Sequence, residues 1–400
     1  MAVVILVLPV SACRLLMPPV TKLIDLTQLS AGAPLIARTE YTCSRNRGSL
    51  SAFPAETELG YDLRSYDLSA LDLASSNDAL SEASFDTDTV WPQALPEGFS
   101  PDDILALGKN PGLGVRALHE QGITGENVGI AIIDQNLLLD HDEYKENIML
   151  YEVVDCVINR TQMHGAAVTS LAAGNTTGVA PDARVYYIAS TFSLDDRTNM
   201  VNAMRRVLEI NAALPEGEKI RVVSISAGVD PHMKGYDEFM EVVEAAKREN
   251  IFVVTPSLFS NYACTLMGLG RAQTADPDDF ASYTAGRFWR DSLSDEAFLS
   301  YLSSSGTQSI LLVPMDARAY AAHTDASAYA YDSTGGMSWA CPWLAGLYAL
   351  CAQVNPSVTP DAFLELAIET GHPFTAAHEN EPLSFGRIAN PAALVDSLRP

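Results

Sequence analysis

Three residues in the sequence carry the side chains that nucleophilic acyl transfer requires. Asp134 follows the apolar run VGIAII, His164 opens the small, apolar stretch MHGAAVTSLAAG, and Ser338 follows two glycines in GGMSWACPWLAG. A serine hydroxyl is a weak acid, so an imidazole must take its proton and a carboxylate must fix the tautomer of that imidazole. Each residue alone has an ordinary explanation, because aspartates often cap helices and most histidines are structural. Together they predict an orienting acid, a base and a nucleophile.

The segment around Ser338 predicts the start of a buried helix. Gly335 and Gly336 permit a tight turn, and Pro342 is tolerated only within a first helical turn. Residues 339–352 are apolar on all sides, which is typical of a helix in the centre of a large core. At such a helix start, free N–H groups and the helix dipole would stabilise negative charge on a bound carbonyl. The alternative is that Ser338 only caps the helix.

Strands and helices alternate from about residue 128 onward. Continuous apolar runs are expected of strands that are buried on both faces of a parallel sheet. These runs are Val128–Ile133, Val185–Ile188, Val222–Ile225, Ile251–Val254 and Ile310–Val313. Helical patterns lie between them at 199–213 and 236–248, and residues 101–120 also look helical. The sequence therefore predicts an α/β fold with a doubly wound, mostly parallel sheet flanked by helices, and with the chemistry beyond the carboxyl ends of the strands.

The first hundred residues have a different character. Residues 1–13 form a short apolar run that ends in VSAC, which predicts an export signal and resembles a bacterial lipobox with Cys13 as the lipid-carrying residue. No Lys or Arg precedes this run, and an ordinary buried strand is the alternative. Residues 14–100 contain a five-residue repeat, YDLRS, YDLSA and LDLAS, between positions 61 and 75. Three copies are too few for a stable solenoid. We therefore interpret 14–100 as an N-terminal extension or pro-segment that is partly loosely ordered, and 101–400 as the main domain.

Composition limits the partners and cofactors. A chain of 400 residues with 48% hydrophobic composition can bury a large core. The net charge of −25 argues against a nucleic-acid partner, since phosphate binding needs clustered Lys and Arg, and it fits a secreted or cell-envelope protein. The six cysteines show neither metal nor disulfide spacing, and the histidines show no metal spacing. No cofactor or metal site is predicted, although structural calcium remains open.

Three blocks of the sequence resemble the signature blocks of the subtilase family of serine peptidases. They are AIIDQNLLLDHDEY, MHGAAVTSLAAGNTTGVAPDARVYYIAS and GGMSWACPWLAGLYALCAQVNPSVTPDAFLELAIETG, and they occur in the Asp, His, Ser order of subtilisins. The resemblance implies a subtilisin-like serine endopeptidase that cleaves a peptide or protein substrate through an acyl-enzyme. It makes Asp134 the residue that orients the base, His164 the general base and then acid, and Ser338 the nucleophile.

The resemblance also implies residues that bind substrate. Ser226, Ala227 and Gly228 stand where the family has a strand that pairs with extended peptide and walls the primary specificity pocket. The backbone N–H of Ser338 would supply half of the oxyanion hole.

The remaining oxyanion donor departs from the family pattern. Phe259 stands where the family has an Asn, so Asn261, two residues on, is the candidate donor and Ser257 a weaker one. Loss of one donor typically lowers turnover by about a hundredfold to a thousandfold. With Trp339 beside the nucleophile, this departure leaves a second hypothesis, a subtilase-fold pseudoenzyme or regulatory protein that binds peptide with weak or no turnover.

A third hypothesis takes GMSWA as the nucleophile elbow of an α/β-hydrolase. That fold requires its Asp and His after the serine, and only a short tail with Asp361, His372 and His378 follows. Chain order therefore disfavours it.

Overall fold

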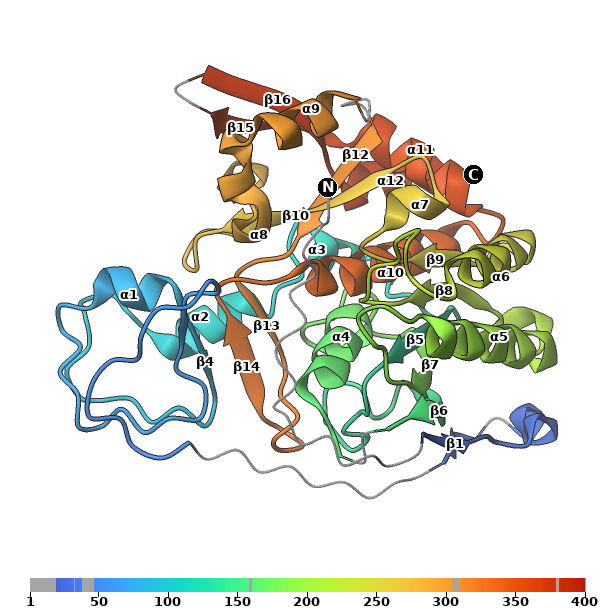
Figure 1. Ribbon diagram of the computed structural model, residues 1–400, viewed down its shortest axis with the longest axis horizontal. Helices are drawn as coiled ribbons and strands as arrows, with labels where there is room; N and C mark the ends of the chain where they lie inside the picture. The colour runs from blue at the N-terminus through green and yellow to red at the C-terminus, as the bar shows by residue number, and fades with distance from the viewer. Residues whose placement is uncertain are drawn as a thin grey trace.

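The computed structural model describes residues 19–31, 33–37, 47–157, 160–304, 309–378 and 381–399, which fold into three sheets with helices around them (Figure 1). The strands are β1 Val20–Lys22, β2 Leu35–Ile36, β3 Tyr61–Asp62, β4 Ala83–Asp86, β5 Gly129–Asp134, β6 Ile148–Cys156, β7 Arg184–Ala189, β8 Ile220–Ser224, β9 Phe252–Val254, β10 Thr265–Arg271, β11 Tyr283–Ala285, β12 Ile310–Pro314, β13 Arg318–Ala321, β14 Tyr329–Asp332, β15 His372–His378 and β16 Glu381–Ile388. The α-helices are α1 Asn77–Ser81, α2 Pro101–Gly108, α3 Val115–His119, α4 Met163–Ala173, α5 Thr198–Ala213, α6 Tyr236–Arg248, α7 Leu258–Asn261, α8 Arg287–Arg290, α9 Glu296–Ser304, α10 Met337–Val354, α11 Pro360–Thr370 and α12 Pro391–Leu398. The predicted export signal, with Cys13, lies outside the described residues.

The main sheet has the strand order β1-β6-β7-β5-β8-β9, and β2 also pairs with β6. Strands β6, β7, β5, β8 and β9 run parallel to one another, whereas β1 runs antiparallel to β6. Along β5, Ile130 and Ile132 enter the core that α4 and α10 line, while Ala131 and Ile133 enter the core of α5 and α6. Burial on both faces explains the unbroken apolar runs of these strands.

The fifth predicted strand lies in another sheet, so the prediction of one sheet for all five runs is wrong at this point. Strand β12 belongs to a sheet of order β11-β10-β12-β16-β15. After β9 the chain turns through α7, and the free edge of β9 is covered by a side chain: Val253 N–H donates to the Tyr262 hydroxyl at 3.0 Å. Because that backbone donor is already satisfied, β10 does not extend the main sheet.

Residues 47–100, called here the coil unit, are well packed, so loose order is not what the structure shows for them. Leu63, Leu68 and Leu73 occupy the same position in the three repeats and are at most 2% exposed. The carbonyl of each leucine accepts a hydrogen bond from the N–H three residues later, at 2.9 to 3.2 Å. Each repeat therefore makes one turn, and the three leucines point into a common core.

Neighbouring segments explain why three repeats suffice. On one side Asp67 exchanges backbone hydrogen bonds with Gly48 and Leu50, and on the other Leu68 N–H donates to the Val90 carbonyl at 2.8 Å. The repeats thus form one coil between two segments that lack the motif. Sequence periodicity alone does not reveal those partners.

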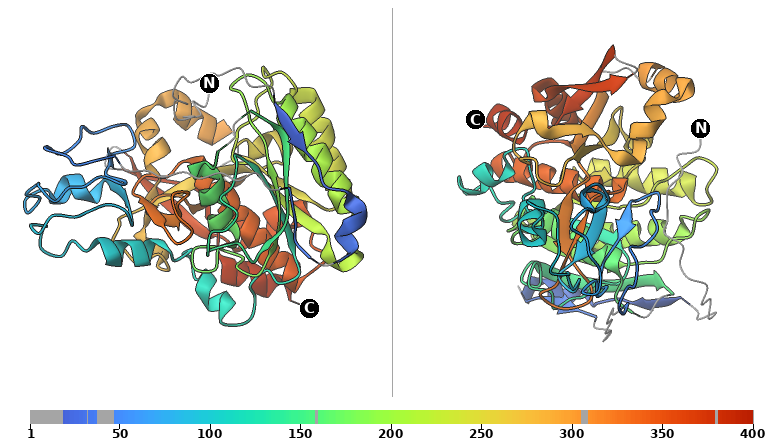
Figure 2. Two further views of the ribbon diagram at one scale, coloured as in Figure 1. Left: turned by 90° about the horizontal axis from the view of Figure 1, so that it is seen from below. Right: turned by 90° about the vertical axis from the view of Figure 1, so that its left-hand side faces the viewer.

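Two sets of strand pairings join the described segments among the first hundred residues to the rest of the chain. Strand β4 of the coil unit pairs antiparallel with β14, which completes a sheet of order β13-β14-β4-β3. Strands β1 and β2 pair with β6 at the edge of the main sheet. Figure 2 shows the coil unit at one end of the molecule and β1, an edge strand of the main sheet, near the other.

Helix α10 runs through the core, as its apolar sequence predicts, and residues 339–352 are all buried. In the described part of the chain, no helix has the length and apolar character needed to cross a membrane. The four described cysteines, Cys156, Cys264, Cys341 and Cys351, are buried and form no disulfide with one another.

Candidate active site

Asp134 and His164 meet at the carboxyl end of β5. Asp134 is the last residue of β5 and is 2% exposed, and His164 is the second residue of α4. The Nδ1 atom of His164 lies 2.7 Å from Asp134 Oδ1, and the same oxygen accepts a hydrogen bond from the Gln135 N–H at 2.7 Å. A carboxylate held in this way fixes both the orientation and the tautomer of the imidazole.

The glycine after His164 allows this approach. A Cβ atom on Gly165 would lie 2.5 Å from the Tyr187 hydroxyl oxygen and 2.7 Å from the Gln135 carbonyl oxygen. The Tyr187 hydroxyl also donates a short hydrogen bond to that carbonyl. Only a residue without a side chain lets α4 start this close to the end of β5.

The imidazole of His164 is easier to protonate than an ordinary histidine. Burial lowers its pKa, but the charge of Asp134 and its hydrogen bond raise the pKa by more, so the net shift is upward. The His164 side chain is 23% exposed, so solvent still reaches the ring.

Ser338 is the second residue of α10, and the N-cap position is taken by Gly336. The Ser338 hydroxyl donates to the Ser226 carbonyl oxygen at 3.3 Å. Ser338 is therefore not the N-cap of α10, so the alternative that it only caps the helix is wrong. As one of the first residues of the helix, Ser338 has an N–H without a helical acceptor.

Pro342 explains why Ser226 is next to Ser338. It is the sixth residue of α10, so the prediction that it lies in the first turn is wrong. Proline has no N–H, which leaves the carbonyl four residues earlier, that of Ser338, without its helical donor. The Ser226 hydroxyl donates to that carbonyl at 2.9 Å instead. The start of α10 is thereby attached to the segment after β8.

His164 and Ser338 are not hydrogen-bonded to each other in this structure. Among the described residues, the hydrogen bond of the His164 ring is to Asp134, and the hydroxyl of Ser338 bonds to Ser226. Catalytic hydrogen bonds often form fully only when substrate is bound.

The predicted substrate-binding segment is only partly available. Ser226 and Ala227 are half-buried, whereas Gly228 is buried, and its carbonyl accepts a hydrogen bond from Arg197 Nε at 2.8 Å. Arg197 is 4% exposed. Sequence reasoning missed this arginine, because nothing in its local pattern shows that it reaches Gly228.

The structure does not bring Asn261 to Ser338 by a hydrogen bond. Both polar atoms of the Asn261 side chain are buried without a partner, and its carbonyl accepts from Lys247 Nζ at 2.5 Å. Phe259, at the position where the family has its Asn, is 52% exposed. The Ser257 hydroxyl accepts a hydrogen bond from Val229 N–H at 2.9 Å. The assignment of Asn261 as the oxyanion donor stays a prediction.

Asp316 is a second buried carboxylate that sequence reasoning missed. Only Met315 lies between it and the end of β12, so the signal that selected Asp134, a carboxylate after a buried strand, also applied to it. Its oxygens accept hydrogen bonds from Gly335 N–H at 2.7 Å and from Arg287 N–H at 2.8 Å. Asp316 therefore holds the backbone three residues before Ser338.

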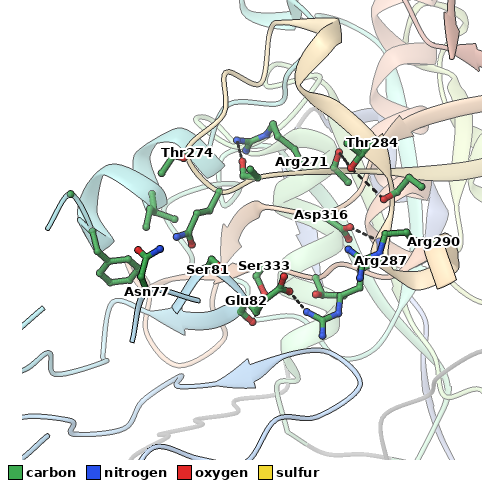
Figure 3. Close-up of a pocket in the computed structure, with 18 of the residues that line it drawn as sticks. Asn77, Ser81, Glu82, Arg271, Thr274, Thr284, Arg287, Arg290, Asp316 and Ser333 are labelled. Atoms are coloured by element: carbon green, nitrogen blue, oxygen red, sulfur yellow. Dashed lines mark hydrogen bonds and ion pairs between the residues drawn. The ribbon is translucent and has the colours of Figure 1, made fainter. Parts of the chain in front are cut away.

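A pocket of about 360 Å³ lies beside Asp316, between the coil unit and the segment before Ser338 (Figure 3). Arg287 crosses this pocket and forms an ion pair with Glu82 of the coil unit. None of the three residues of the predicted triad lines it.

Within the described ranges, no group of three or more His, Cys, Asp or Glu side chains could hold a metal ion.

Comparison with known proteins finds a family match over part of the chain, which ends before Ser338. Residues 125–257 match the model of the subtilase family. This range includes Asp134, His164 and the segment after β8. The predicted resemblance to subtilases is thus confirmed, and it supports a protease of the serine type.

Solved structures with a subtilase-like fold are similar to this chain. The A-subunit of the AB5 toxin from E. coli is 13% identical, with a TM-score of 0.51, and the match covers 73% of this chain and 99% of the toxin subunit. The PatG macrocyclase in complex with peptide is 15% identical, with a TM-score of 0.50 and coverage of 71% and 95%. At these identities the similarity shows the fold alone. No curated protein sequence matches the chain significantly.

Proposed function

We propose that this protein is a serine endopeptidase that hydrolyses peptide bonds through an acyl-enzyme on Ser338. The observation that carries the proposal is the 2.7 Å contact of Asp134 with His164, in a segment that matches the subtilase family. Ser338 adds to it, because it lies at the start of α10 and its side chain does not cap the helix. In this proposal Asp134 orients the base, His164 moves the proton and Ser338 is the nucleophile.

Acylation begins when Ser338 turns its hydroxyl to His164. The Nε2 atom of His164 takes the hydroxyl proton as Ser338 Oγ attacks the carbonyl carbon of the substrate. In this proposal the Ser338 N–H and the N-terminal end of α10 stabilise the resulting oxyanion. His164 then gives its proton to the leaving amine, and the C–N bond breaks.

Deacylation repeats these steps with water. His164 takes a proton from water, the hydroxide attacks the acyl carbon, and the proton returns to Ser338 Oγ as the ester bond breaks. Throughout, Asp134 stays ionised and stabilises the imidazolium.

An extended peptide is the substrate class we propose. Ser226 and Ala227 are half-buried, Ser226 bonds to Ser338, and extended peptides bind by backbone pairing along segments of this kind. The Gly228 carbonyl is already bonded to Arg197, so we expect fewer backbone hydrogen bonds to substrate than a free strand edge would provide. A macrocyclase of the same fold is described in complex with peptide, which is consistent with this substrate class.

The second candidate function is peptide binding with weak or no turnover. The exposed Phe259 at the family's Asn position and the unpartnered amide of Asn261 favour it, since one oxyanion donor is then missing. Retention of the Asp134–His164 contact favours the peptidase.

Activity-based labelling separates the two. We expect a fluorophosphonate probe to label wild-type protein and Ser357→Ala, an exposed serine that serves as the control, but not Ser338→Ala. A fluorogenic peptide library should be cleaved by the same two proteins. Labelling without measurable cleavage would support the binding function, and absence of labelling in folded wild-type protein would refute the peptidase.

Export to the cell envelope or outside the cell, with lipid on Cys13, is also proposed, on the VSAC motif and the net charge of −25. Mass spectrometry of the N-terminus of the native protein measures both the cleavage position and the lipid.

A further inference from the structure

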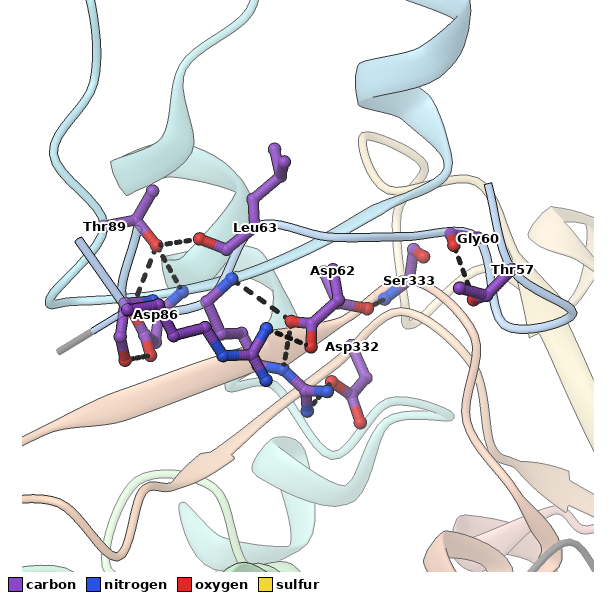
Figure 4. Close-up of polar contacts among 12 residues, drawn as sticks. Thr57, Gly60, Asp62, Leu63, Asp86, Thr89, Asp332 and Ser333 are labelled. Atoms are coloured by element: carbon purple, nitrogen blue, oxygen red, sulfur yellow. Dashed lines mark hydrogen bonds and ion pairs between the residues drawn. The ribbon is translucent and has the colours of Figure 1, made fainter. Parts of the chain in front are cut away.

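The coil unit contributes one buried arginine to the interior next to the proposed active site. The Nε atom of Arg64, in the first of the three repeats, donates to Asp62 Oδ1 at 2.8 Å. Its Nη1 lies 3.1 Å from Asp332 Oδ1 on β14 and 3.1 Å from the Tyr320 hydroxyl oxygen on β13. In Figure 4, Asp62 comes from the coil unit and Asp332 from β14.

These contacts lie in a buried environment, so they are costly to break. The side chains of Arg64 and Asp332 are 14% and 11% exposed. Burial raises the pKa of Asp332, and the charge of Arg64 together with the polar groups of Tyr320 and Trp339 offsets part of that rise. A buried carboxylate that loses its cation must take up a proton or move toward water.

Two aromatic contacts continue from this cluster to the proposed base. The ring of Tyr320 packs against that of Trp339 with centroids 5.1 Å apart, and the Trp339 ring packs against the imidazole of His164 at 5.5 Å. Trp339 directly follows Ser338 in the chain. Arg64 therefore contacts Tyr320, whose ring packs against Trp339, and Trp339 in turn packs against the proposed base.

The coil unit is also packed as an integral part of the fold. Phe85 on β4 pairs with Tyr331 on β14, and their rings lie 5.1 Å apart. At the other end of the molecule, Glu152, which is fully buried, accepts a hydrogen bond from the Ile24 N–H at 2.7 Å. Removal of the first hundred residues would expose the ring of Tyr331 that packs against Phe85, and Glu152 would lose the hydrogen bond from the Ile24 N–H.

We propose that Arg64 is a positioning residue for the active site, acting through Asp332, Tyr320 and Trp339 on His164, and that the coil unit remains in the mature protein. The inference rests on the proposed function for its meaning in catalysis. It opposes the interpretation of residues 14–100 as a pro-segment.

The test compares Arg64→Met with Arg64→Lys, which keeps the positive charge. Without Arg64, Trp339 is held less firmly, water reaches the imidazole more easily, and the burial that lowers the pKa of His164 weakens. We expect the NMR titration of the His164 ring, assigned by its loss in His164→Gln, to move upward by about half a pH unit. We expect kcat to fall about tenfold or more with KM changed far less, since misplaced catalytic groups lose rate more than binding. Arg64→Lys should restore most of the wild-type kcat and most of the wild-type pKa of His164.

Arg47→Met is the matched control. Arg47 also belongs to the coil unit and pairs with Asp62 at 2.6 Å, and the structure gives it no contact with Asp332 or Tyr320. We expect its His164 titration and its rates to equal those of wild type. Should Arg64→Met fail to fold, Tyr320→Phe takes its place, because it removes only the hydroxyl that Arg64 contacts.

The titration does not depend on turnover, so it separates the two proposals. If wild type hydrolyses no peptide but Arg64→Met moves the His164 titration, the peptidase fails and the positioning role stands. An unchanged titration in Arg64→Met, or the same shift in Arg47→Met, would overturn the positioning role. Mass spectrometry of the mature native protein tests the remaining part: a chain that starts after residue 100 would overturn retention of the coil unit, and one that includes Arg64 supports it.

Discussion

Asp316 provides a test of the electrostatics beside the nucleophile. It is 5% exposed and accepts hydrogen bonds from the backbone of Gly335 and Arg287 (Figure 3). Burial raises its pKa to about 7, because the two N–H donors and the charges of Arg290 and Arg287 offset only part of the cost of burying the carboxylate. The unfolded chain restores the ordinary value of 3.8.

The pH dependence of stability follows from these two values. Between pH 3.8 and about 7 the folded protein holds a proton on Asp316 that the unfolded chain has released. The free energy of unfolding therefore falls by about 1.4 kcal/mol per pH unit in this window. The contribution is complete below pH 3.8 and is lost as pH rises through about 7. From pH 5 to pH 8 the loss from this one group is about 3 kcal/mol.

Asp316→Asn removes the titration. The asparagine side chain places an NH2 group where one of the two accepting oxygens stands, whereas the protonated carboxyl keeps an oxygen at both positions, so the variant should be less stable at acidic pH by about 1 to 3 kcal/mol. The decisive property of this variant is how its free energy of unfolding changes with pH. Urea unfolding at pH 5 and pH 8 should show that wild type loses about 3 kcal/mol more over this range than Asp316→Asn does. The exposed Asp237→Asn serves as a control and should keep the wild-type slope. Equal slopes for wild type and Asp316→Asn would refute the assignment of a buried, proton-holding carboxyl.

Three further outcomes follow from single contacts. Asp134→Asn should lower kcat about ten-thousandfold. It should also move the acid limb of the pH–rate profile to lower pH, since the charge that raises the pKa of His164 is gone. Rates measured from about pH 5 to about pH 9 test both effects. Gly165→Ala should lower kcat by about a hundredfold because its Cβ would displace α4 from the Tyr187 hydroxyl, and wild-type rates would contradict the close approach. Arg206→Met leaves a fully buried glutamate of β6 without its cation, so urea unfolding should show a loss of about 3 to 5 kcal/mol, and an unchanged midpoint would rule this out.

Local pattern was sufficient for the central elements. The apolar runs predict β5, β7, β8 and β9, because strands buried on both faces exclude polar residues at every position. The apolar stretch after Ser338 likewise predicts α10. The meeting of Asp134 with His164 was also predictable, since residues at the ends of parallel strands and at the following helix starts share one edge of the sheet.

Other features depend on partners that no local pattern names. The donor that replaces the Pro342 N–H comes from Ser226, and the side chain that ends the main sheet at β9 is Tyr262. The donor at the oxyanion position likewise depends on a residue that no local pattern identifies. Asn261 was selected only by its position in the sequence, two residues after Phe259. Its side chain forms no hydrogen bond with the described residues.

The sequence by itself determined strands β5, β7, β8 and β9 of the main sheet, the buried helix and the order of Asp134, His164 and Ser338, because each is encoded by neighbouring residues or by motif order. Strand β6 was not predicted, although it lies in the same sheet. Only the tertiary structure decided how residues 47–100 pack. Their repeat looks too short to be stable, yet it packs between two other segments and places Arg64 against Asp332, which lies 268 positions later. Burial and ion pairing depend on which residues are close in space, and this cannot be predicted from their separation in the sequence.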